Sequence, residues 1–336
     1  GFVSATGIAG LTLGGGFGYL TRKFGWTTDN VAAFEVVTAE GRVVRASEKQ
    51  HPDLFWGLCG GGGNFGVVTH VDYRLHTVGP EIVGGAIAWR AADAPAVLAM
   101  YRALIASAPP ELTVAMVFRP APPAPWLPNE VHGTPVVVLI VCCSSAVAEG
   151  ERLVAPIKAF GKPVGDVVVR RPYCAQQSLL DATQPKGRRY YWKSEYLPEV
   201  ESALTERLIA HGATFVSPHS ALILFPIDGA LNRLPNEHAA VGNRDARVVL
   251  NLTSAWERAA DDARNVEWAR AVWQDTKRFS TGGSYINFQS DDEGQERTAA
   301  AYGGNLARLV DVKTRWDPDN VFRCNKNIAP RRLAGS

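Results

Sequence analysis

No stretch of this 336-residue sequence approaches the ~18 consecutive apolar residues that a membrane-spanning helix requires. One apolar run, residues 136–141, is short and β-branched, which is typical of a buried strand. The 35 Lys and Arg residues nearly balance 33 Asp and Glu, and no basic block or aromatic-basic alternation occurs. We therefore expect neither a membrane nor a nucleic acid as partner. The length and the 46% apolar content suit a soluble protein with two lobes.

Cysteine is scarce and histidine is scattered. The five cysteines form no C-x-x-C pair, and the odd count indicates buried or free thiols rather than a disulfide framework. No histidine has a second ligand at the spacing of a zinc site. The histidines are residues 51, 70, 76, 132, 211, 219 and 238. We expect no metal.

Glycine, in contrast, is concentrated in two clusters, residues 14–18 and 60–66. Gly61, Gly63 and Gly66 fit the dinucleotide fingerprint G-x-G-x-x-G by letter. That fingerprint needs a strand before it and a helix beginning inside it. Here a short helix over 52–58 precedes the cluster and an alternating strand over 67–75 follows it, so the Rossmann interpretation fails. Neither cluster ends in the Lys-Ser/Thr of a P-loop.

The two clusters flank a predicted hairpin, with arms at 34–38 and 43–46 and a turn at Gly41. One alternative is that the glycines only fill tight turns in a packed sheet. Two clusters around one hairpin favour a backbone that approaches a phosphate-bearing cofactor closely. Residues 17–24 are predicted to form a short helix that Gly25 closes.

From about residue 81 to 290, predicted strands alternate with predicted helices. The strands are 83–89, 112–118, 136–143, 222–225 and 247–253, and the helices are 95–107, 146–160, 199–211 and 261–279. Periodicity alone leaves open whether the sheet is parallel or antiparallel. Residues 120–128 are proline-rich and predict an extended surface loop. Residues 297–310 are predicted to be helical.

Several segments together resemble the berberine-bridge-enzyme-like group of FAD-linked oxidases, in the vanillyl-alcohol-oxidase superfamily. They are 7–18, Asp29-Asn30, 52–56, 63–69, 285–288 and 316–330. The resemblance implies an α+β protein with a partial PCMH-type FAD-binding lobe and a substrate lobe whose antiparallel sheet is backed by helices. It divides the chain into residues 1–78 (FAD-binding), 79–295 (substrate-binding) and 296–336 (a tail that returns to the FAD-binding lobe).

The resemblance also implies which residues bind FAD. Backbone amides of the two glycine turns suit the pyrophosphate and adenine, because turn amides form anion-binding concavities without charged side chains. The predicted FAD-binding residues are Gly7, Ile8, Ala9, Gly10, Leu11, Gly14, Gly15, Gly16, Gly18, Gly62, Gly63, Asn64, Gly66, Val67, Val68, Asn287, Asn325 and Asn327. The three asparagines are predicted donors to the flavin ring, although Asn325 and Asn327 could equally cap turns of the tail.

Tyr285 is the predicted catalytic residue, as a base or a hydrogen-bond donor. In a strand, Tyr285 and Asn287 would face the same side. A tyrosine has an ordinary pKa of ~10, so its site would have to lower that pKa for it to serve as a base. The alternative is a core tyrosine with a satisfied hydroxyl. The implied reaction is hydride transfer from an alcohol, sugar or secondary-metabolite substrate to flavin N5, with O2 as acceptor.

Weaker candidates lie elsewhere. The aromatic and cationic run Tyr190 to Tyr196 could wall a substrate cleft, although such clusters are mostly core packing. Arg244 follows Asn243, where the family often has a histidine, and this departure weakens a role for the position.

The N-terminus departs from the family in two ways. A cysteine that links the flavin in some relatives is Val3 here, so at most one covalent histidyl link is expected, from a residue that this chain lacks. The first phosphate-binding loop of the family is also expected to lie upstream of Gly1. We therefore expect either a fragment of an enzyme or another chain that supplies the missing half. No signal peptide is visible, which suggests a cytoplasmic location. A non-catalytic flavin-fold scaffold is the alternative function.

Overall fold

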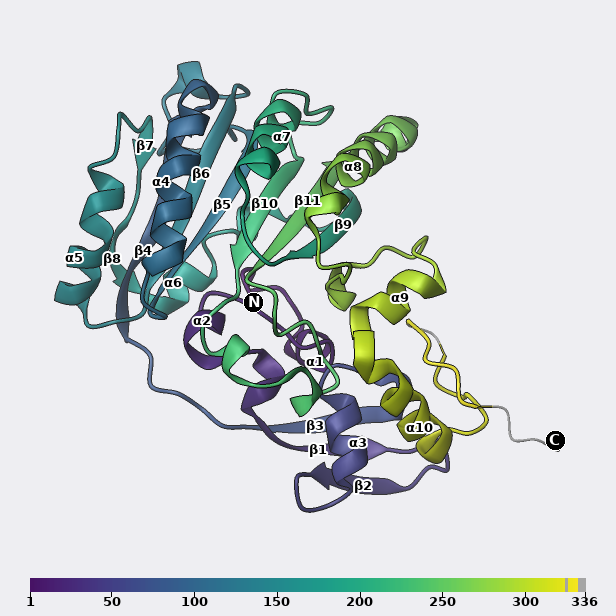
Figure 1. Ribbon diagram of the computed structural model, residues 1–336. Coiled ribbons are helices and arrows are strands. Elements are labelled where there is room, and N and C mark those ends of the chain that lie inside the picture. Colours follow the sequence, from purple (N-terminus) through teal and green to yellow (C-terminus); the bar gives the residue numbers. More distant parts are fainter. Residues whose placement is uncertain (324–325, 332–336) are drawn as a thin grey trace.

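The computed structural model describes residues 1–323 and 326–331, and it contains two antiparallel sheets (Figure 1). The smaller sheet has three strands in the order β2-β1-β3, with β1 Val31–Val37, β2 Val43–Ser47 and β3 Val67–Tyr73. The predicted hairpin is confirmed, because β1 pairs with β2 from Ala33↔Ser47 to Val37↔Val43. The predicted short helix is α3, Pro52–Leu58, with the proline in its first turn.

The larger sheet has eight strands. Seven follow the order β7-β4-β6-β5-β10-β11-β9, and β8 pairs with β4. Its strands are β4 Glu81–Arg90, β5 Leu112–Pro120, β6 Pro135–Cys143, β7 Gly165–Asp166, β8 Val169–Pro172, β9 Arg189–Leu197, β10 Ala221–Pro226 and β11 Val248–Trp256. Every pairing is antiparallel, so the α+β prediction is confirmed.

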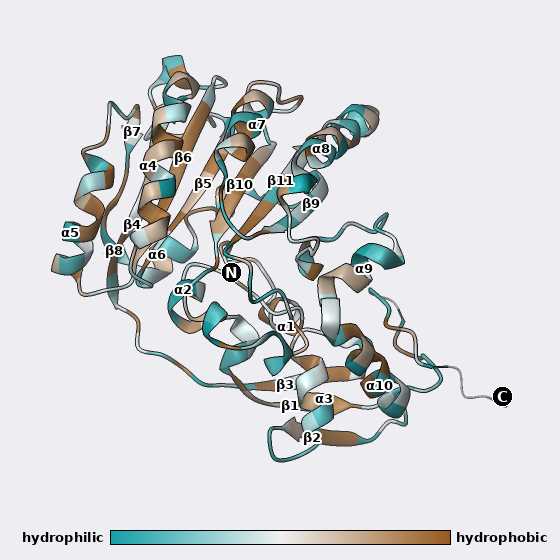
Figure 2. Ribbon diagram, viewed as in Figure 1, coloured by the Kyte–Doolittle hydropathy of each residue, from teal (hydrophilic) through white to brown (hydrophobic). Residues whose placement is uncertain are grey.

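Four long helices cover one face of this sheet (Figure 1). They are α4 Ala94–Ser107, α5 Val147–Lys158, α7 Ser202–Gly212 and α8 Asp262–Thr276. Strand residues that point toward them, such as Met116, Leu222 and Leu250, are fully buried with the apolar side chains of the helices. Figure 2 shows brown strands behind helices whose outer sides are teal. We call this side the helix face. We call the opposite side the bare face because no long helix covers it, although N-terminal residues such as Phe2 and Trp26 pack against it.

The remaining helices are short or lie near the smaller sheet. They are α1 Ile8–Leu13, α2 Thr21–Phe24, α6 Tyr173–Gln177, α9 Gln295–Tyr302 and α10 Leu306–Trp316. Two predictions were wrong in extent. The helix predicted over 17–24 is only α2, and the helix predicted over 297–310 is two helices. The break between α9 and α10 lies at Gly303, whose φ of 52° is in the left-handed region that favours glycine.

Candidate active site

The turn at residues 7–10, which we call the first glycine turn, presents free backbone amides to solvent. Residues 4–10 are exposed, and the side chain of Ile8 is 55% exposed. Helix α1 begins after Gly7 without a side-chain cap, so the N–H groups of Ile8, Ala9 and Gly10 have no acceptor among the described residues. No atom lies within 4 Å of the position that a Cβ would take on Gly7 or Gly10. An anionic group can therefore approach this backbone closely, as a dinucleotide pyrophosphate requires.

Asn287 connects this turn to Tyr285. Its Nδ2 donates to the backbone oxygen of Leu11 at 3.1 Å and to the Tyr285 hydroxyl at 2.8 Å. The Asn287 amide occupies the space where a Cβ on Gly14 would lie, which explains the glycine. Both Nδ2 hydrogens are thus used within the protein, so a donor role of Asn287 to the flavin ring stays a prediction.

The strand predicted around Tyr285 was wrong. Residues Ile286–Phe288 form a 3-10 turn, which the hydrogen bond from the Phe288 amide to the Tyr285 oxygen closes at 2.9 Å. The two polar side chains nevertheless meet. The contact comes from the tight turn and from Leu11, not from the alternation of a strand.

Tyr285 lies in a cluster of aromatic rings. Its ring is parallel to that of Trp26 at 6.0 Å and edge-on to those of Phe17 at 4.7 Å and Phe288 at 4.9 Å. Burial raises the pKa of Tyr285 above its ordinary value, although hydrogen bonds from Asn287 and from the backbone of Gly16 and Phe17 oppose this effect. The lowered pKa that a base would need is therefore not found. The hydroxyl keeps its proton at neutral pH and can donate it in a hydrogen bond.

The second glycine turn holds the C-terminal tail. The 3-10 turn Gly62–Asn64 contacts α1, so the second glycine cluster lies against the helix that begins after Gly7. The Asn64 side chain accepts from the Ile328 amide at 2.9 Å, and Lys313 donates to the Asn64 backbone oxygen at 2.8 Å. Lys313 also pairs with Asp317 at 2.5 Å, with both side chains fully buried.

The residues of this turn differ in access. Gly62 and Gly63 are half-buried, Gly66 is buried against Val36, and Val67 is exposed. Asn325 lies outside the described residues. The Oδ1 atom of Asn327 is buried and has no hydrogen-bond partner within residues 1–323 and 326–331. A buried acceptor of this kind is expected to have a partner in the functional protein.

The bare face of the large sheet carries buried polar atoms without partners. They are the Thr113 hydroxyl, the Ser194 hydroxyl and the Asn251 Nδ2, on side chains at most 2% exposed. Asn251 lies directly between Ile223 of β10 and Ser194 of β9. The sequence did hold a signal for Asn251, which interrupts the apolar run 248–252 with an amide. We did not predict these residues as part of the site.

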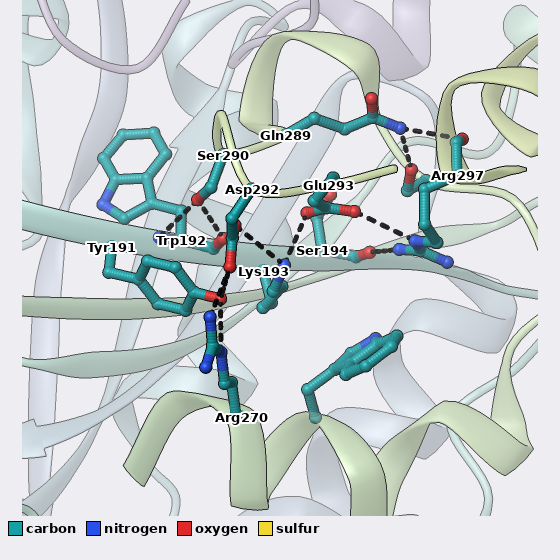
Figure 3. Close-up of polar contacts among 12 residues, drawn as sticks. Tyr191, Trp192, Lys193, Ser194, Arg270, Gln289, Ser290, Asp292, Glu293 and Arg297 are labelled. Atoms are coloured by element: carbon teal, nitrogen blue, oxygen red, sulfur yellow. Dashed lines mark hydrogen bonds and ion pairs between the residues drawn. The ribbon is translucent and has the colours of Figure 1, made fainter. Parts of the chain in front are cut away.

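A network of ion pairs fastens the segment after Tyr285 to strand β9 (Figure 3). Glu293 pairs with Lys193 at 3.2 Å and with Arg297 at 3.0 Å, and Arg297 also pairs with Glu195 at 2.8 Å. Glu195, Glu293 and Lys193 are at most 7% exposed. Such pairs are strongly coupled, because removing one partner leaves a buried charge.

The same segment is held at two further points. Ser290 accepts from the Trp192 amide at 3.3 Å and donates to the Trp192 oxygen at 2.8 Å. Asp292 accepts from the Tyr191 hydroxyl at 2.8 Å and from Arg270 at 2.7 Å, at the rim of the network (Figure 3). Residues 290–297 thereby fix the position at which the turn with Tyr285 and Asn287 leaves the sheet.

The other predicted candidates have structural contacts. Arg244 forms an ion pair with Asp29 at 2.5 Å, and both side chains are buried. The run Tyr190 to Tyr196 is strand β9, which alternates between the faces. Lys193 and Glu195 point to the helix face, and Trp192 and Tyr196 pack on the bare face.

Other classes of site find little support in the described part of the chain. Residues 1–323 and 326–331 contain no group of three or more His, Cys, Asp or Glu side chains that could hold a metal ion. None of the helices described is long and apolar enough to cross a bilayer. Cavities of about 410 and 300 Å3 lie beside α4 and beside α3, and Tyr285 lines neither.

Comparison with known proteins agrees with this geometry. Residues 1–47 match the family model described as FAD binding domain, and residues 284–329 match the model described as Berberine and berberine like. Those two segments hold the first glycine turn and the Tyr285–Asn287 turn with the tail.

Curated relatives match over nearly the whole chain. (R)-6-hydroxynicotine oxidase of Paenarthrobacter nicotinovorans is 29% identical over 96% of this chain and 70% of its own length. A FAD-linked oxidoreductase of Dictyostelium discoideum is 27% identical over 98% of this chain and 70% of its own length. The crystal structure of 6-hydroxy-D-nicotine oxidase from Arthrobacter nicotinovorans superposes with a TM-score of 0.83 at 26% identity. It covers 98% of this chain and 73% of that one.

Proposed function

This chain belongs to the berberine-bridge-enzyme-like family of FAD-linked oxidoreductases, and we propose that it is an oxidase. In this proposal it removes a hydride from an alcohol, sugar or secondary-metabolite substrate, with O2 as the final acceptor. The observation that carries the proposal is Asn287, which joins the open glycine turn at Leu11 to the hydroxyl of Tyr285. A cofactor-binding backbone and a protonated donor are thereby held together.

The residues present fit FAD. The free amides of Ile8, Ala9 and Gly10 would hold the pyrophosphate, and the turn Gly62–Asn64 lies against the same helix. The orphaned Oδ1 of Asn327 would accept from a donor of the cofactor or of its ordered water. FAD, when bound, supplies the two-electron acceptor for the substrate C–H bond that breaks.

Tyr285 would orient the substrate. Its oxygen already accepts from Asn287, so its own O–H is free to donate to the oxygen or nitrogen of the substrate. Because burial raises the pKa of Tyr285, this donor stays protonated over the whole neutral range. The aromatic rings of Phe17, Trp26 and Phe288 fix the ring and exclude water, which strengthens the hydrogen bond.

The bare face of the sheet would supply the substrate contacts. Ser194 and Asn251 carry unpartnered polar atoms that are buried among apolar side chains, a combination that is typical of small-molecule sites. The apolar body of a substrate would lie on the sheet, and these atoms would select its hydroxyl or amine groups.

The test combines cofactor uptake with turnover. The full chain is loaded with FAD and should become yellow, and hydrogen peroxide should form with a panel of alcohols, sugars and cyclic amines. Tyr285→Phe should lower turnover about 100-fold and leave the flavin spectrum unchanged, because only one hydrogen-bond donor is lost.

Tyr101→Phe is the matched control. It removes a buried, unpartnered hydroxyl from the helix face and should leave turnover unchanged. Protein that folds but takes up no FAD, or Tyr285→Phe that turns over like the parent, would contradict the proposal. The first result would favour a non-catalytic flavin-fold scaffold.

A further inference from the structure

Three basic side chains gather at the outer end of the bare face, away from the glycine turns. Arg119 follows Phe118, which pairs with Leu222 of β10, and its side chain lies on the same face as Val117. Arg188 directly precedes β9, and His219 lies shortly before β10. We call Arg119, Arg188 and His219 the basic cluster.

The basic cluster has too little negative charge around it. Glu257 Oε1 is 3.2 Å from His219 Nε2 and 3.9 Å from the nearest nitrogen of Arg188, and this exposed carboxylate is shared by the two. Arg119 donates from Nε to the Pro120 backbone oxygen at 3.2 Å and forms no ion pair with any described residue. One exposed carboxylate, Glu257, therefore serves the Arg188 guanidinium and the His219 imidazole, and Arg119 has no carboxylate partner among the described residues.

The charges are close enough to act on each other. Burial lowers the pKa of Arg119, and the positive charge of Arg188 lowers it further. Burial also lowers the pKa of His219, followed by the charge of Arg188, while Glu257 opposes this shift. The imidazole is accordingly neutral at neutral pH, so the two arginines provide the positive charge. Arg188 also donates from Nη1 to the Thr183 backbone oxygen at 3.5 Å, and its ion pair with the exposed Glu257 is long, at 3.9 Å. A half-buried guanidinium group with no carboxylate or only a distant one is suited to bind another, since it forms charge-assisted paired hydrogen bonds.

A row of aromatic rings leads from Tyr285 to the basic cluster. Phe288 lies 4.9 Å from Tyr285, Trp192 lies 5.0 Å from Phe288, and Tyr190 lies 6.1 Å from Trp192. Tyr190 is two residues from Arg188, whose charge acts on its hydroxyl. The indole Nε1 of Trp192 is buried without a partner along this row. A ligand that reaches from Tyr285 to Arg188 thus meets aromatic surface along its body and positive charge at its end.

We propose that Arg119 and Arg188 form a carboxylate-binding subsite, so that the substrate is an aromatic or otherwise apolar compound with a carboxylate distant from the oxidised carbon. This inference rests on the proposed function for the oxidised end alone. Binding of the carboxylate end requires only the basic cluster and the aromatic row.

The first experiment uses a matched pair of probes, 4-phenylbutyrate and its uncharged amide 4-phenylbutyramide. Calorimetric titration of the full chain, with and without FAD, should show the acid binding about tenfold more tightly than the amide, because charge-assisted hydrogen bonds are the stronger ones. The preference should shrink as salt is raised. Equal affinities, or no binding of either probe, would overturn the proposal without any variant being needed.

The second experiment removes the charges. Arg119→Gln and Arg188→Gln should each remove most of the preference for the acid, and Arg119→Lys should retain part of it. Arg207→Gln is the matched control, because it deletes one half-exposed arginine on α7, at the helix face. A preference that survives in the Arg119→Gln/Arg188→Gln double variant, or that the control also loses, would overturn the assignment.

The outcomes separate this inference from the proposed function. Protein that takes up FAD and oxidises substrates while binding acid and amide equally would refute the carboxylate subsite alone. Protein that prefers the acid but takes up no FAD would refute the oxidase alone.

Discussion

The two faces of the large sheet treat polar groups differently. On the helix face the polar strand residues have partners: the Ser254 hydroxyl donates to the Asn265 oxygen at 3.0 Å, and Glu195 pairs with Arg297. On the bare face, Thr113, Ser194 and Asn251 are equally buried but keep atoms without partners. A buried polar group without a partner costs about 1–3 kcal/mol.

The difference indicates at which face the polar strand side chains are fully hydrogen-bonded by folding alone. The polar strand side chains described on the helix face have partners, and the unpartnered atoms there, the Tyr101 hydroxyl and the Trp268 Nε1, belong to the covering helices α4 and α8. The unsatisfied atoms of the bare face become favourable only when a ligand or ordered water meets them. In the proposed function, the same strands would serve stability on one side and substrate recognition on the other.

Alkaline pH should lower the free energy of unfolding more than any single substitution does, and it should act on the cores at both faces. Burial raises the pKa of seven tyrosines, and five of these are at most 3% exposed. Of the five, Tyr101 belongs to the core at the helix face and the others to the core at the bare face. The others are Tyr19, Tyr196, Tyr285 and Tyr302. The folded protein keeps these protons above pH ~10 while the unfolded chain releases them. The stabilisation is therefore complete below pH 10, and it falls by about 1.4 kcal/mol per pH unit for each tyrosine above it.

The measurement is unfolding by circular dichroism from pH 7 to 12, with tyrosinate absorbance at 295 nm recorded on the same samples. Tyrosinate from these residues should appear together with unfolding. Their gradual ionisation with a midpoint near pH 10 in a folded protein would contradict the prediction.

Leu250→Ala should cost the next largest free energy. Leu250 is fully buried at the helix face, and deletion of such a side chain lowers the free energy of unfolding by about 3 kcal/mol. Urea denaturation of the FAD-free protein measures this change in the free energy of unfolding. The neighbouring Val249→Ala, on the bare face, is the comparison and should cost less, because fewer methylene groups are lost. Equal costs for the two would show that the bare face loses more free energy for each group removed, and is therefore packed more tightly than the helix face.

Much of the fold could be predicted from local sequence. β-branched residues around Gly41 gave the hairpin, and apolar runs gave most strands of the large sheet. Strand β9 was not predicted, because its run Tyr190 to Tyr196 mixes aromatic and charged residues whose partners lie on α8 and in the segment 290–297. Its alternation becomes clear only when both faces are known.

The site was less predictable, because its contacts join distant parts of the chain. Tyr285 and Asn287 were selected by resemblance, but the bond from Asn287 to Leu11 spans 276 residues. The raised pKa of Tyr285 depends on burial by Trp26 and Phe17, which the tyrosine's own neighbours in sequence do not reveal. The apolar sequence around Asn251 predicts a buried strand, but it does not predict which side chains lie opposite the Asn251 amide.

Glu293→Gln tests how much the buried ion pairs that hold residues 290–297 to β9, at the edge of the sheet, contribute to stability. The substitution removes the charge that lies between Lys193 and Arg297, while Asp292 and Glu195 remain as their other partners. We expect the free energy of unfolding to fall by about 2 kcal/mol, in the range of hydrogen bonds to charged groups. Asp292→Asn, at the more exposed rim, should cost less than about 1 kcal/mol. The reverse order would mean that the buried pairs do not fasten the segment 290–297.

Asn251→Leu should have the smallest effect on stability and the most selective effect on function. Replacing an unpartnered amide by an apolar side chain of similar size removes the Nδ2 desolvation cost, so the free energy of unfolding should change by less than about 1 kcal/mol. The Thr253 hydroxyl, which donates to the Asn251 Oδ1, loses its acceptor and offsets part of the gain. If the bare face recognises substrate, KM should rise about tenfold or more with flavin uptake unchanged, because a polar substrate group then faces a methyl group. Denaturation and steady-state kinetics on one preparation decide the matter. A large loss of stability would show that the Asn251 amide is satisfied within the fold, and the contrast between the two faces would then disappear at its central residue.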